Sequence, residues 1–329
     1  MRSLGRDGPI VSSLGLGCMG MSAFYGPADE AESIATIHEA IDHGISLIDT
    51  GDFYGMGHNE LLLREALKGG RREHVFIQVK FGAQRDPKGA FLGFDARPAA
   101  AKTALAYTLH RLGTDYIDLY QPARLDPSVP IEETVGAIAD MVKAGYVRHI
   151  GLSEMGAQTI RRAHAVHPIS ELQIEYSLMS RGIEAEILPT LRELGIGVTA
   201  YGVLSRGILG GTGKDGLHAR DARAHSPRWQ GLNLKKNLEL ASGLDALARD
   251  LHATPVQLAI AWVLSRGKDI VPLIGSRTRV QLRDAMGALK LKLTNEQLDL
   301  IGRTVPAEAV AGTRYPAEQM AMLDSERAR

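Results

Sequence analysis

Residues 31–49 read AESIATIHEAIDHGISLID, and this stretch combines a helical pattern with a short strand. Apolar residues recur at helical spacing over residues 31–43, as expected of an amphipathic helix. Residues 46–49 form a short β-type run that ends in a carboxylate, Asp49. A helix that leads into such a strand is typical of the repeating unit of parallel βαβ folds.

The same alternation extends along the chain in both directions and produces eight strands. We expect these strands at residues 13–16, 46–49, 75–80, 116–120, 147–152, 171–175, 197–201 and 270–274. Helical patterns lie between them at residues 31–43, 97–112, 131–144, 184–194 and 255–265, and several have Asp, Glu or Pro near the start, as helix entry favours. Eight such units predict an α/β protein with a closed (β/α)8 barrel, the TIM barrel. Because no low-complexity linker divides the chain, residues 1–329 are expected to form a single domain.

The composition excludes several functional classes. The chain is 44% hydrophobic and 23% charged, with 38 basic and 38 acidic residues, which is ordinary for a globular protein. A net charge of zero gives no electrostatic footprint for nucleic acid or an anionic membrane, so the expected partner is a small molecule. The single cysteine, Cys18, fits a reducing compartment, and no apolar stretch matches a signal peptide or a membrane span. We therefore expect a cytoplasmic protein.

The active site of such a barrel forms at the carboxyl ends of its strands. The widest gap in the pattern follows the seventh expected strand, from Ser205 to about Lys235, where glycines lie among charged residues. Long loops in compact domains are usually functional or mobile. We expect this loop to contribute to substrate specificity, which the pattern itself does not define.

Three residues at the ends of the second and third strands form a candidate proton-transfer group. Asp49 ends one strand, Lys80 ends the next, and Tyr54 lies in the loop after Asp49. A buried lysine needs a partner, and Asp49 is the nearest candidate. A charged Lys80 beside Tyr54 would favour the phenolate and lower a pKa that is ordinarily about 10. The alternative interpretation is a structural ion pair beside a tyrosine that only lines a loop.

The residues around this group resemble a known family. The segments that carry the resemblance are LIDTGDFYG (47–55), Asn59-Glu60, Leu67-Lys68, Lys80, GYVRHIGLS (145–153) and IGSR (274–277). Together they are similar to the signature of the aldo-keto reductases, and the resemblance covers essentially the whole chain. It implies NADPH-dependent reduction of an aldehyde or ketone, with Tyr54 as proton donor, Lys80 tuning it and Asp49 holding Lys80.

The chain departs from that family at one catalytic position. The family usually carries a histidine on the loop after the fourth strand, whereas the run DLYQPARLDP (118–127) places Ala123 there. Loss of one preorganised donor can reduce the rate by about 100-fold or more. The carbonyl would then be positioned by Tyr54 alone, by a water in the space beside Ala123, or by Arg124, whose family counterpart more often supports the loop.

The resemblance also implies the residues that hold the nicotinamide. Ser153 and Gln173 would bind its carboxamide, and Tyr201 would stack on its ring. The remaining positions implied for the cofactor along the strand ends and loops are Met19, Gly20, Gly202, Leu204, Ser205, Gly207, Leu209 and Ile274. Glu154 and Ala285 stand where many relatives carry asparagine, so the chain departs from the family at these two cofactor positions.

The stretch Gly275-Ser276-Arg277-Thr278-Arg279 leaves the eighth strand and enters a helix. Backbone N–H groups, a hydroxyl and guanidinium groups at a helix amino terminus predict a phosphate site. Arg277 would bind a 2′-phosphate and favour NADPH over NADH. Gln281 and Asp284, one and two turns along the helix, are expected near the adenosine. A solvated basic helix start is the alternative, especially for Arg279.

Two glycine-rich motifs are rejected as nucleotide sites because their context is wrong. GLGCMG (15–20) matches G-x-G-x-x-G but is not followed directly by a helix, and GGTGKD (210–215) has neither the glycine spacing nor the hydroxyl of a P-loop. The histidines lack metal-type spacing, so no metal is predicted. Two other functions stay open: an aldolase with Lys80 as Schiff-base nucleophile, and a sensory barrel that binds NADPH with low turnover.

Overall fold

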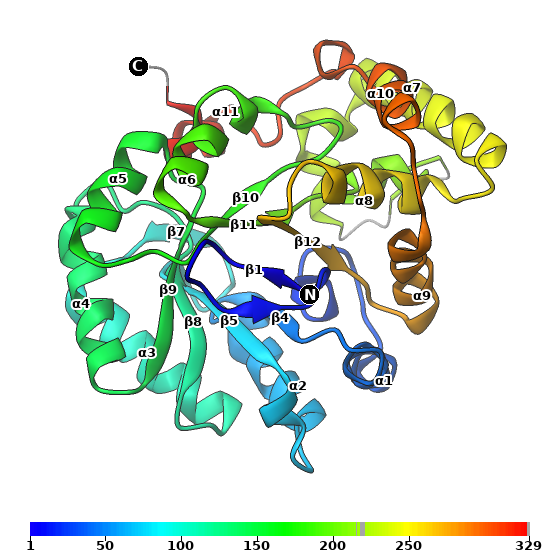
Figure 1. The fold of residues 1–329 in the computed structure, drawn as a ribbon. Helices are drawn as coiled ribbons and strands as arrows, with labels where there is room; N and C mark the ends of the chain where they lie inside the picture. Colours follow the sequence, from blue (N-terminus) through cyan, green and yellow to red (C-terminus); the bar gives the residue numbers. More distant parts are fainter. Residues whose placement is uncertain (215, 218–220, 328–329) are drawn as a thin grey trace.

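The computed structural model describes residues 1–214, 216–217 and 221–327, and a closed barrel of eight parallel strands forms its centre (Figure 1). The strands are β3 (Gly15–Gly17), β4 (Leu47–Gly51), β5 (Phe76–Phe81), β8 (Ile117–Pro122), β9 (Val147–Ser153), β10 (Glu171–Glu175), β11 (Gly197–Tyr201) and β12 (Ile270–Gly275). They follow one another around the barrel in chain order, and the ring closes where Leu273 of β12 lies opposite Gly15 of β3. The predicted (β/α)8 barrel is confirmed, and each predicted strand overlaps its observed counterpart.

Helices surround the barrel (Figure 1). They are α1 (Glu30–Asp42), α2 (His58–Ala66), α3 (Pro98–Leu112), α4 (Ile131–Lys143), α5 (Ala157–Val166), α6 (Ile187–Leu194), α7 (Gly231–Asp250), α8 (Pro255–Ser265), α9 (Arg279–Gly287), α10 (Asn295–Thr304) and α11 (Ala317–Ala321). Local sequence sets many of their ends. In α8, for example, the Thr254 hydroxyl accepts from the Gln257 N–H while the Gln257 side chain accepts from the Thr254 N–H, which makes a capping box ahead of Pro255.

Successive side chains of each strand point alternately toward the helices and into the barrel, so two apolar layers form. Outward residues such as Ile48 and Ile77 join the large apolar cluster beneath the helices. Inward residues of β4 and β12 include Leu47 and Leu273, which belong to a second cluster inside the barrel. The inward position that follows Leu47 on β4 is Asp49, so polar side chains replace apolar ones toward the carboxyl end of the barrel.

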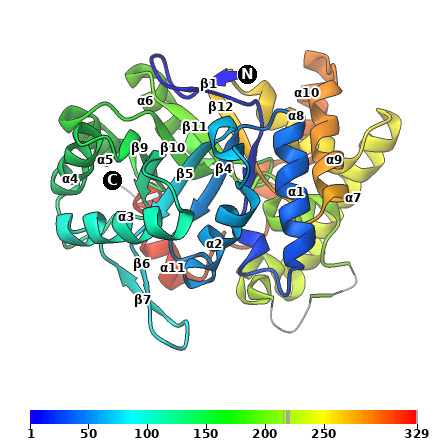
Figure 2. The ribbon, with the colours of Figure 1, turned by 90° about the horizontal axis from the view of Figure 1, so that it is seen from below.

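Two hairpins that the sequence analysis did not predict lie at the opposite ends of the barrel. The first, β1 (Arg2–Ser3) with β2 (Ile10–Val11), covers the amino end. The second, β6 (Ala83–Arg85) with β7 (Phe91–Phe94), follows β5 at the carboxyl end. Figure 2 shows β6 and β7 projecting on the same side of the molecule as α11, away from β1.

The long loop after β11 is shorter and more structured than predicted. Its residues form 3₁₀ turns at Ser205–Gly210, Ala222–His225 and Pro227–Trp229, and α7 already begins at Gly231 instead of near Lys235. Residues 215 and 218–220 of this loop, including Asp215 of the rejected glycine-rich motif, lie outside the described residues. No helix in the part of the chain that the structure describes is both long and apolar enough to cross a membrane.

Candidate active site

A buried ion pair joins β4 and β5 inside the barrel. Asp49 lies opposite Gln78 in the register of these strands, and Lys80 shares the face of Gln78 because it lies two residues further on. The Lys80 Nζ donates to Asp49 Oδ1 at 2.5 Å, and only 4% of the lysine and 7% of the aspartate side chain is exposed. The pairing expected from the sequence is therefore present in the structure.

Two glutamines complete the surroundings of this carboxylate. Gln78 Nε2 and Gln173 Nε2 donate to the same Asp49 Oδ1 at 2.8 and 2.7 Å. Three donors from two strands, β5 and β10, thus fix the carboxylate, and with it Lys80, in one position. Gln173, expected at a nicotinamide carboxamide, uses its amide nitrogen on Asp49 here, and Gln78 was not predicted as part of the site.

Tyr54 lies directly beyond β4 and faces this pair. It opens the 3₁₀ turn Tyr54–Gly57, and its side chain is almost fully buried. The Lys80 Nζ lies over the face of the phenol ring, 5.1 Å from the ring centroid. The structure therefore brings Tyr54, Lys80 and Asp49 together, as the sequence analysis expected.

The predicted lowering of the pKa of Tyr54 is wrong in direction. Burial raises the pKa of the Tyr54 hydroxyl well above its ordinary value, and the negative charge of Asp49 raises it further, whereas Arg124 opposes them. The physical reason is that burial disfavours the charged phenolate, while the charge of Lys80, which would favour it, is compensated by Asp49 at 2.5 Å. The phenol is therefore neutral at pH 7, which is the form that a proton donor requires.

Ala123 and Arg124 follow β8 on the same side of the barrel. Ala123 is buried, and its N–H donates to the Phe81 carbonyl at 2.8 Å. Its methyl group offers no donor where the resemblance led us to expect a histidine. The neighbouring Arg124 donates from Nη1 to the Ala123 carbonyl at 2.5 Å and to Ser153 Oγ at 3.3 Å, and from Nη2 to Tyr315 Oη at 3.4 Å.

Glu154, at the position where an asparagine was expected, is the centre of an ionic cluster. Arg314 donates to both of its carboxylate oxygens at 2.9 Å, and the hydroxyls of Tyr201 and Ser325 donate at 2.6 and 2.7 Å. Burial by itself would raise the pKa of Glu154, but the charge and hydrogen bonds of Arg314 outweigh it and hold the pKa well below its usual range. This residue therefore anchors the carboxy-terminal segment and is not a substitute for an amide ligand.

The residues after β11 differ in how they could meet a ligand. The Tyr201 hydroxyl also lies 2.9 Å from Tyr315 Oη, which fixes the ring expected to stack on a nicotinamide. The other implied positions here are Gly202, with φ of 65°, Leu204, Ser205, Gly207 and Leu209. The Leu209 side chain belongs to the large apolar cluster, so only the backbone of that residue is available to a cofactor.

Residues expected at a phosphate converge where β12 meets α9. Ile274 and Gly275 end β12, and Ser276 Oγ is buried and has no hydrogen-bond partner among the described residues. Arg277 Nη1 donates to the carbonyls of Tyr25 and Pro27 at 2.8 and 3.2 Å. An orphaned hydroxyl beside a guanidinium that donates to carbonyl groups is a donor set that fits a phosphate.

The loop after β3 approaches the same place. Met19 and Gly20 lie in the 3₁₀ turn Met19–Met21. A Cβ atom on Gly20 would lie 3.2 Å from Tyr25 Cδ2 and 3.3 Å from Arg277 Cγ, so a side chain there would crowd this contact. The first and last loops of the barrel therefore adjoin at the predicted phosphate site.

The residues further along α9 have structural partners. Gln281 Oε1 accepts from the Arg277 N–H at 2.9 Å, which orders the predicted phosphate loop. Asp284 Oδ1 accepts from Thr254 Oγ1 at 2.8 Å and from Gln257 Nε2 at 3.0 Å, so Asp284 joins α9 to α8. The expectation that Asp284 reaches an adenosine is not supported by these contacts.

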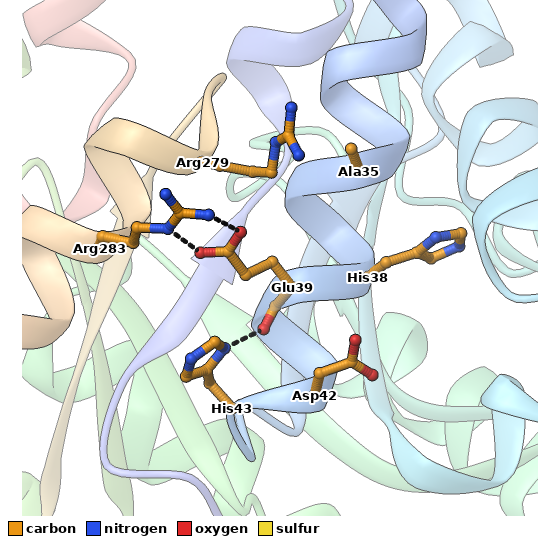
Figure 3. Close-up of a pocket in the computed structure, with 7 residues that line it drawn as sticks. All are labelled: Ala35, His38, Glu39, Asp42, His43, Arg279 and Arg283. Carbon is orange, nitrogen blue, oxygen red and sulfur yellow. Dashed lines mark hydrogen bonds and ion pairs between the residues drawn. The ribbon is translucent and has the colours of Figure 1, made fainter.

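A hollow of about 550 Å³ lies outside the barrel between α1 and α9 (Figure 3). Arg283 and Glu39 form an ion pair across it at 2.6 Å, and Arg279 is paired with Glu32 at 2.9 Å. Because Tyr54, Lys80 and Asp49 are not part of its lining, the hollow is separate from the proposed catalytic group. No cluster of histidine, cysteine or acidic residues suited to a metal occurs within the described residues.

Comparison with known proteins identifies the family. The model of the aldo/keto reductase family matches residues 13–305. The chain belongs to the aldo/keto reductase family. This aldo/keto reductase is 44% identical over 319 residues to "Probable aldo-keto reductase 1" of Glycine max, covering 95% of this chain and 90% of the relative. The family consists of oxidoreductases that act on small carbonyl compounds, so the resemblance drawn from the sequence is confirmed.

Solved structures agree with the fold of this aldo/keto reductase. The glycerol dehydrogenase of Gluconobacter oxydans matches with a TM-score of 0.83 and 29% identity, covering 96% of this chain and 98% of that one. The holo form of an aldo-keto reductase from Bacillus halodurans matches with a TM-score of 0.77 and 27% identity, covering 93% of this chain and 96% of that one. These similarities extend over nearly the full length of each chain.

The carboxy-terminal part of the site in this aldo/keto reductase has no signal in the sequence pattern. Arg314 and Tyr315 reach Glu154 and Tyr201 from a segment more than 100 residues away in the chain. No local pattern marks them, because an isolated arginine and tyrosine in a loop carry no periodicity. Gln78 was accessible to prediction, since it lies two residues before Lys80 and so shares its face of β5.

Proposed function

We propose that this protein is an NADPH-dependent carbonyl reductase in which Tyr54 donates the proton to the carbonyl oxygen. The observation that carries the proposal is the buried, neutral phenol of Tyr54 beside the Lys80–Asp49 ion pair. When NADPH is bound, it supplies the hydride for the carbonyl carbon. The Tyr54 O–H supplies the proton, and the oxygen of the substrate becomes a hydroxyl.

Lys80 and Asp49 have separate parts in this proposal. After donation Tyr54 is a phenolate, and the positive charge of Lys80 near its ring stabilises that anion until a proton returns from solvent. Asp49 holds Lys80 in place through the 2.5 Å contact. The same ion pair gives no support to a Schiff-base aldolase, because that reaction requires a neutral lysine amine.

The proposed cofactor site extends from β9 around to β12. Ser153, Gln173 and Tyr201 would surround the nicotinamide. Ser276 and Arg277 would bind the 2′-phosphate, because among the described residues the buried Ser276 hydroxyl lacks a partner and the Arg277 guanidinium donates to carbonyl oxygens and to no carboxylate. This donor set supports a preference for NADPH over NADH.

The test is consumption of NADPH against a panel of aldehydes and ketones by the wild type and by Tyr54→Phe. We expect Tyr54→Phe to lose on the order of 100-fold or more in kcat/KM, as removal of a general acid does. Tyr107→Phe is the matched control, because that tyrosine is 61% exposed on α3 and its substitution should leave the rate unchanged.

Binding of NADPH is measured on the same variants by fluorescence, so that a folding defect is recognised. Full activity in Tyr54→Phe would disprove the proposed proton donor. NADPH binding without oxidation by any carbonyl in the panel would favour the sensory barrel instead.

A further inference from the structure

Charged side chains gather beyond the carboxyl ends of β8 to β11, and their charges do not balance. The guanidinium groups are those of Arg124, Arg206, Arg228 and Arg314, and the carboxylates that pair with them are those of Glu154, Glu175 and Glu326. Arg314 contacts all three carboxylates, whereas Arg206 and Arg228 contact Glu175. Within the described part of the chain, no carboxylate lies within 4.0 Å of Arg124. Arg124 is therefore the one guanidinium of these four without a carboxylate in direct contact among the described residues.

The contacts that Arg124 does make are with uncharged groups only, among the residues that the structure describes. Nη1 donates to the carbonyl of its own neighbour, Ala123, and the other two contacts are with the hydroxyls of Ser153 and Tyr315 at 3.3 and 3.4 Å. Those two distances are at the upper limit for a hydrogen bond. A buried charge normally has a counter-charge, and a planar guanidinium binds a carboxylate through two parallel hydrogen bonds. The arrangement thus leaves Arg124 suited to an anionic ligand.

Arg124 also lies within electrostatic reach of the proposed proton donor. Its charge opposes the burial-driven rise in the pKa of Tyr54. It contacts Ser153, which ends β9 beside the expected nicotinamide position. An anion on Arg124 would therefore be next to the carbonyl that Tyr54 protonates.

We infer that Arg124 binds a carboxylate of the substrate, so that the preferred substrates are carbonyl compounds that carry a carboxylate, such as 2-oxo acids and short semialdehydes. This inference rests on the proposed reductase function. It does not make Arg124 a replacement for the family's histidine, because a guanidinium stays protonated in proteins and relays no proton. Arg124 is a specificity-determining residue that orients the substrate while Tyr54 carries out the proton transfer.

The kinetic test compares each acid with a neutral analogue: glyoxylate with glycolaldehyde, and 4-oxobutanoate with its methyl ester. We expect wild-type kcat/KM to favour the acids by about tenfold or more, because charge-assisted bidentate hydrogen bonds are strong. Arg124→Gln should abolish that preference through KM, so that kcat/KM falls much further for each acid than for its neutral analogue. Arg124→Lys, which keeps the charge but loses the planar fork, should retain part of it.

Arg161→Gln serves as the control, because Arg161 pairs with Glu193 on the surface of α5 and should not discriminate between acids and neutral aldehydes. An equal fall in kcat for acids and neutral aldehydes in Arg124→Gln would overturn the inference, since it would assign Arg124 to the carbonyl. Equal wild-type rates for each acid and its analogue would overturn it as well.

A second measurement separates this inference from the proposed function. Calorimetric titration with butanoate and with butanamide, in the presence of NADP⁺, needs no turnover. We expect wild type to bind butanoate at least about tenfold more tightly than Arg124→Gln does, and butanamide equally weakly in both. That result supports the carboxylate site even if no carbonyl is reduced, whereas equal butanoate affinity in the two proteins excludes it.

Discussion

Glu171 is an acid inside the barrel that the proposed reaction does not use. It is fully buried on β10, and its Oε2 accepts from the Thr199 hydroxyl. The side-chain amide of Gln121 is oriented with its nitrogen toward Glu171 and the Leu152 carbonyl, and this nitrogen donates to Glu171 Oε1 at 2.8 Å. The pKa of Glu171 is raised to about 8. Burial is the main cause and Asp49 adds to it, while the Thr199 hydrogen bond and Lys80 oppose the rise. The barrel therefore holds a neutral glutamic acid at pH 7.

This assignment predicts how stability depends on pH. In the unfolded chain the carboxyl ionises near its ordinary value of 4.5, whereas in the folded protein it keeps its proton up to about 8. Stability should therefore fall by about 1.4 kcal/mol per pH unit as pH rises through this window. Glu171→Gln removes that loss, so the variant should gain stability relative to wild type at pH 9 and little at pH 4.5. Thermal unfolding at the two pH values measures this, and an equal difference at both would contradict it.

Residue-scale prediction from sequence succeeds where strand periodicity applies. Asp49 and Lys80 were found because each ends a short apolar run, and the same alternation of side chains extends to Gln78. The pKa direction of Tyr54 was not accessible in this way, because it depends on how deeply the ring is buried and on whether Asp49 already neutralises Lys80. The periodicity of a strand thus predicts which side chains point into the barrel, but it does not predict their pKa values.

At the scale of elements, the amino-terminal hairpin closes the end of the barrel opposite to the active site. Leu4 and Val11 enter the inner apolar cluster with Leu47 and Leu273, and the Arg6 N–H donates to the Gly195 carbonyl at 2.7 Å. Strands of two residues have no period, so the sequence pattern contained no signal for this hairpin. The start of α8, which has a capping box, was predicted at Pro255, whereas α7, whose first turn has no capping side chain, was not among the predicted helices.

Gly197 at the start of β11 is required by the close approach of this hairpin. A Cβ atom there would lie 2.6 Å from Gly5 N and 2.7 Å from Leu4 Cα, and backbone atoms cannot rotate away. We therefore predict that Gly197→Ala destabilises the protein by roughly 1–3 kcal/mol through overpacking. The measurement is the unfolding midpoint by circular dichroism.

Gly136→Ala is the matched control for this substitution. Gly136 lies within α4, and a Cβ atom there would meet nothing within 4 Å. Since alanine is a better helix former than glycine by about 1 kcal/mol, this variant should be stabilised. If Gly197→Ala unfolded at the wild-type temperature, the hairpin would not be packed as tightly as described.

At the scale of the whole molecule, the carboxy-terminal segment is fastened across the strand ends that form the candidate active site. Arg314 links it to Glu154 and Glu175, and Asp324 Oδ2 accepts from the Gly156 N–H at 2.8 Å. The partners are separated by 139 to 168 residues along the chain, so no local motif predicts them. The barrel can be predicted from repeated local patterns. The position of the carboxy-terminal segment across the site can be seen only in the folded structure.

Removing Arg314 should be among the costliest single changes outside the catalytic group. The Arg314 side chain is 8% exposed, and Arg314→Met would leave Glu154 and Glu175 buried without their shared cation. Loss of one partner from a buried pair destabilises by about 3–5 kcal/mol at neutral pH. Arg162→Met is the control, because Arg162 pairs with Glu132 on the surface with side chains 55% and 40% exposed, and this change should cost less than about 1 kcal/mol.

The pH dependence of the same variants tests the electrostatic origin of this effect. Because Arg314 holds the folded pKa of Glu154 below its ordinary value of 4.5, the stabilisation is present above that pH and is lost as pH falls below it. The melting temperatures of wild type and Arg314→Met should therefore approach each other as pH is lowered from 7 toward 3. In Glu154→Gln/Arg314→Met the loss should be smaller than the sum of the two single losses, since the buried carboxylate is gone. Additive losses of stability, or a difference in melting temperature that stays constant with pH, would contradict this prediction. Either result would mean that Arg314 stabilises the segment by packing alone and that the charge of Glu154 does not help to hold the carboxy-terminal segment in place.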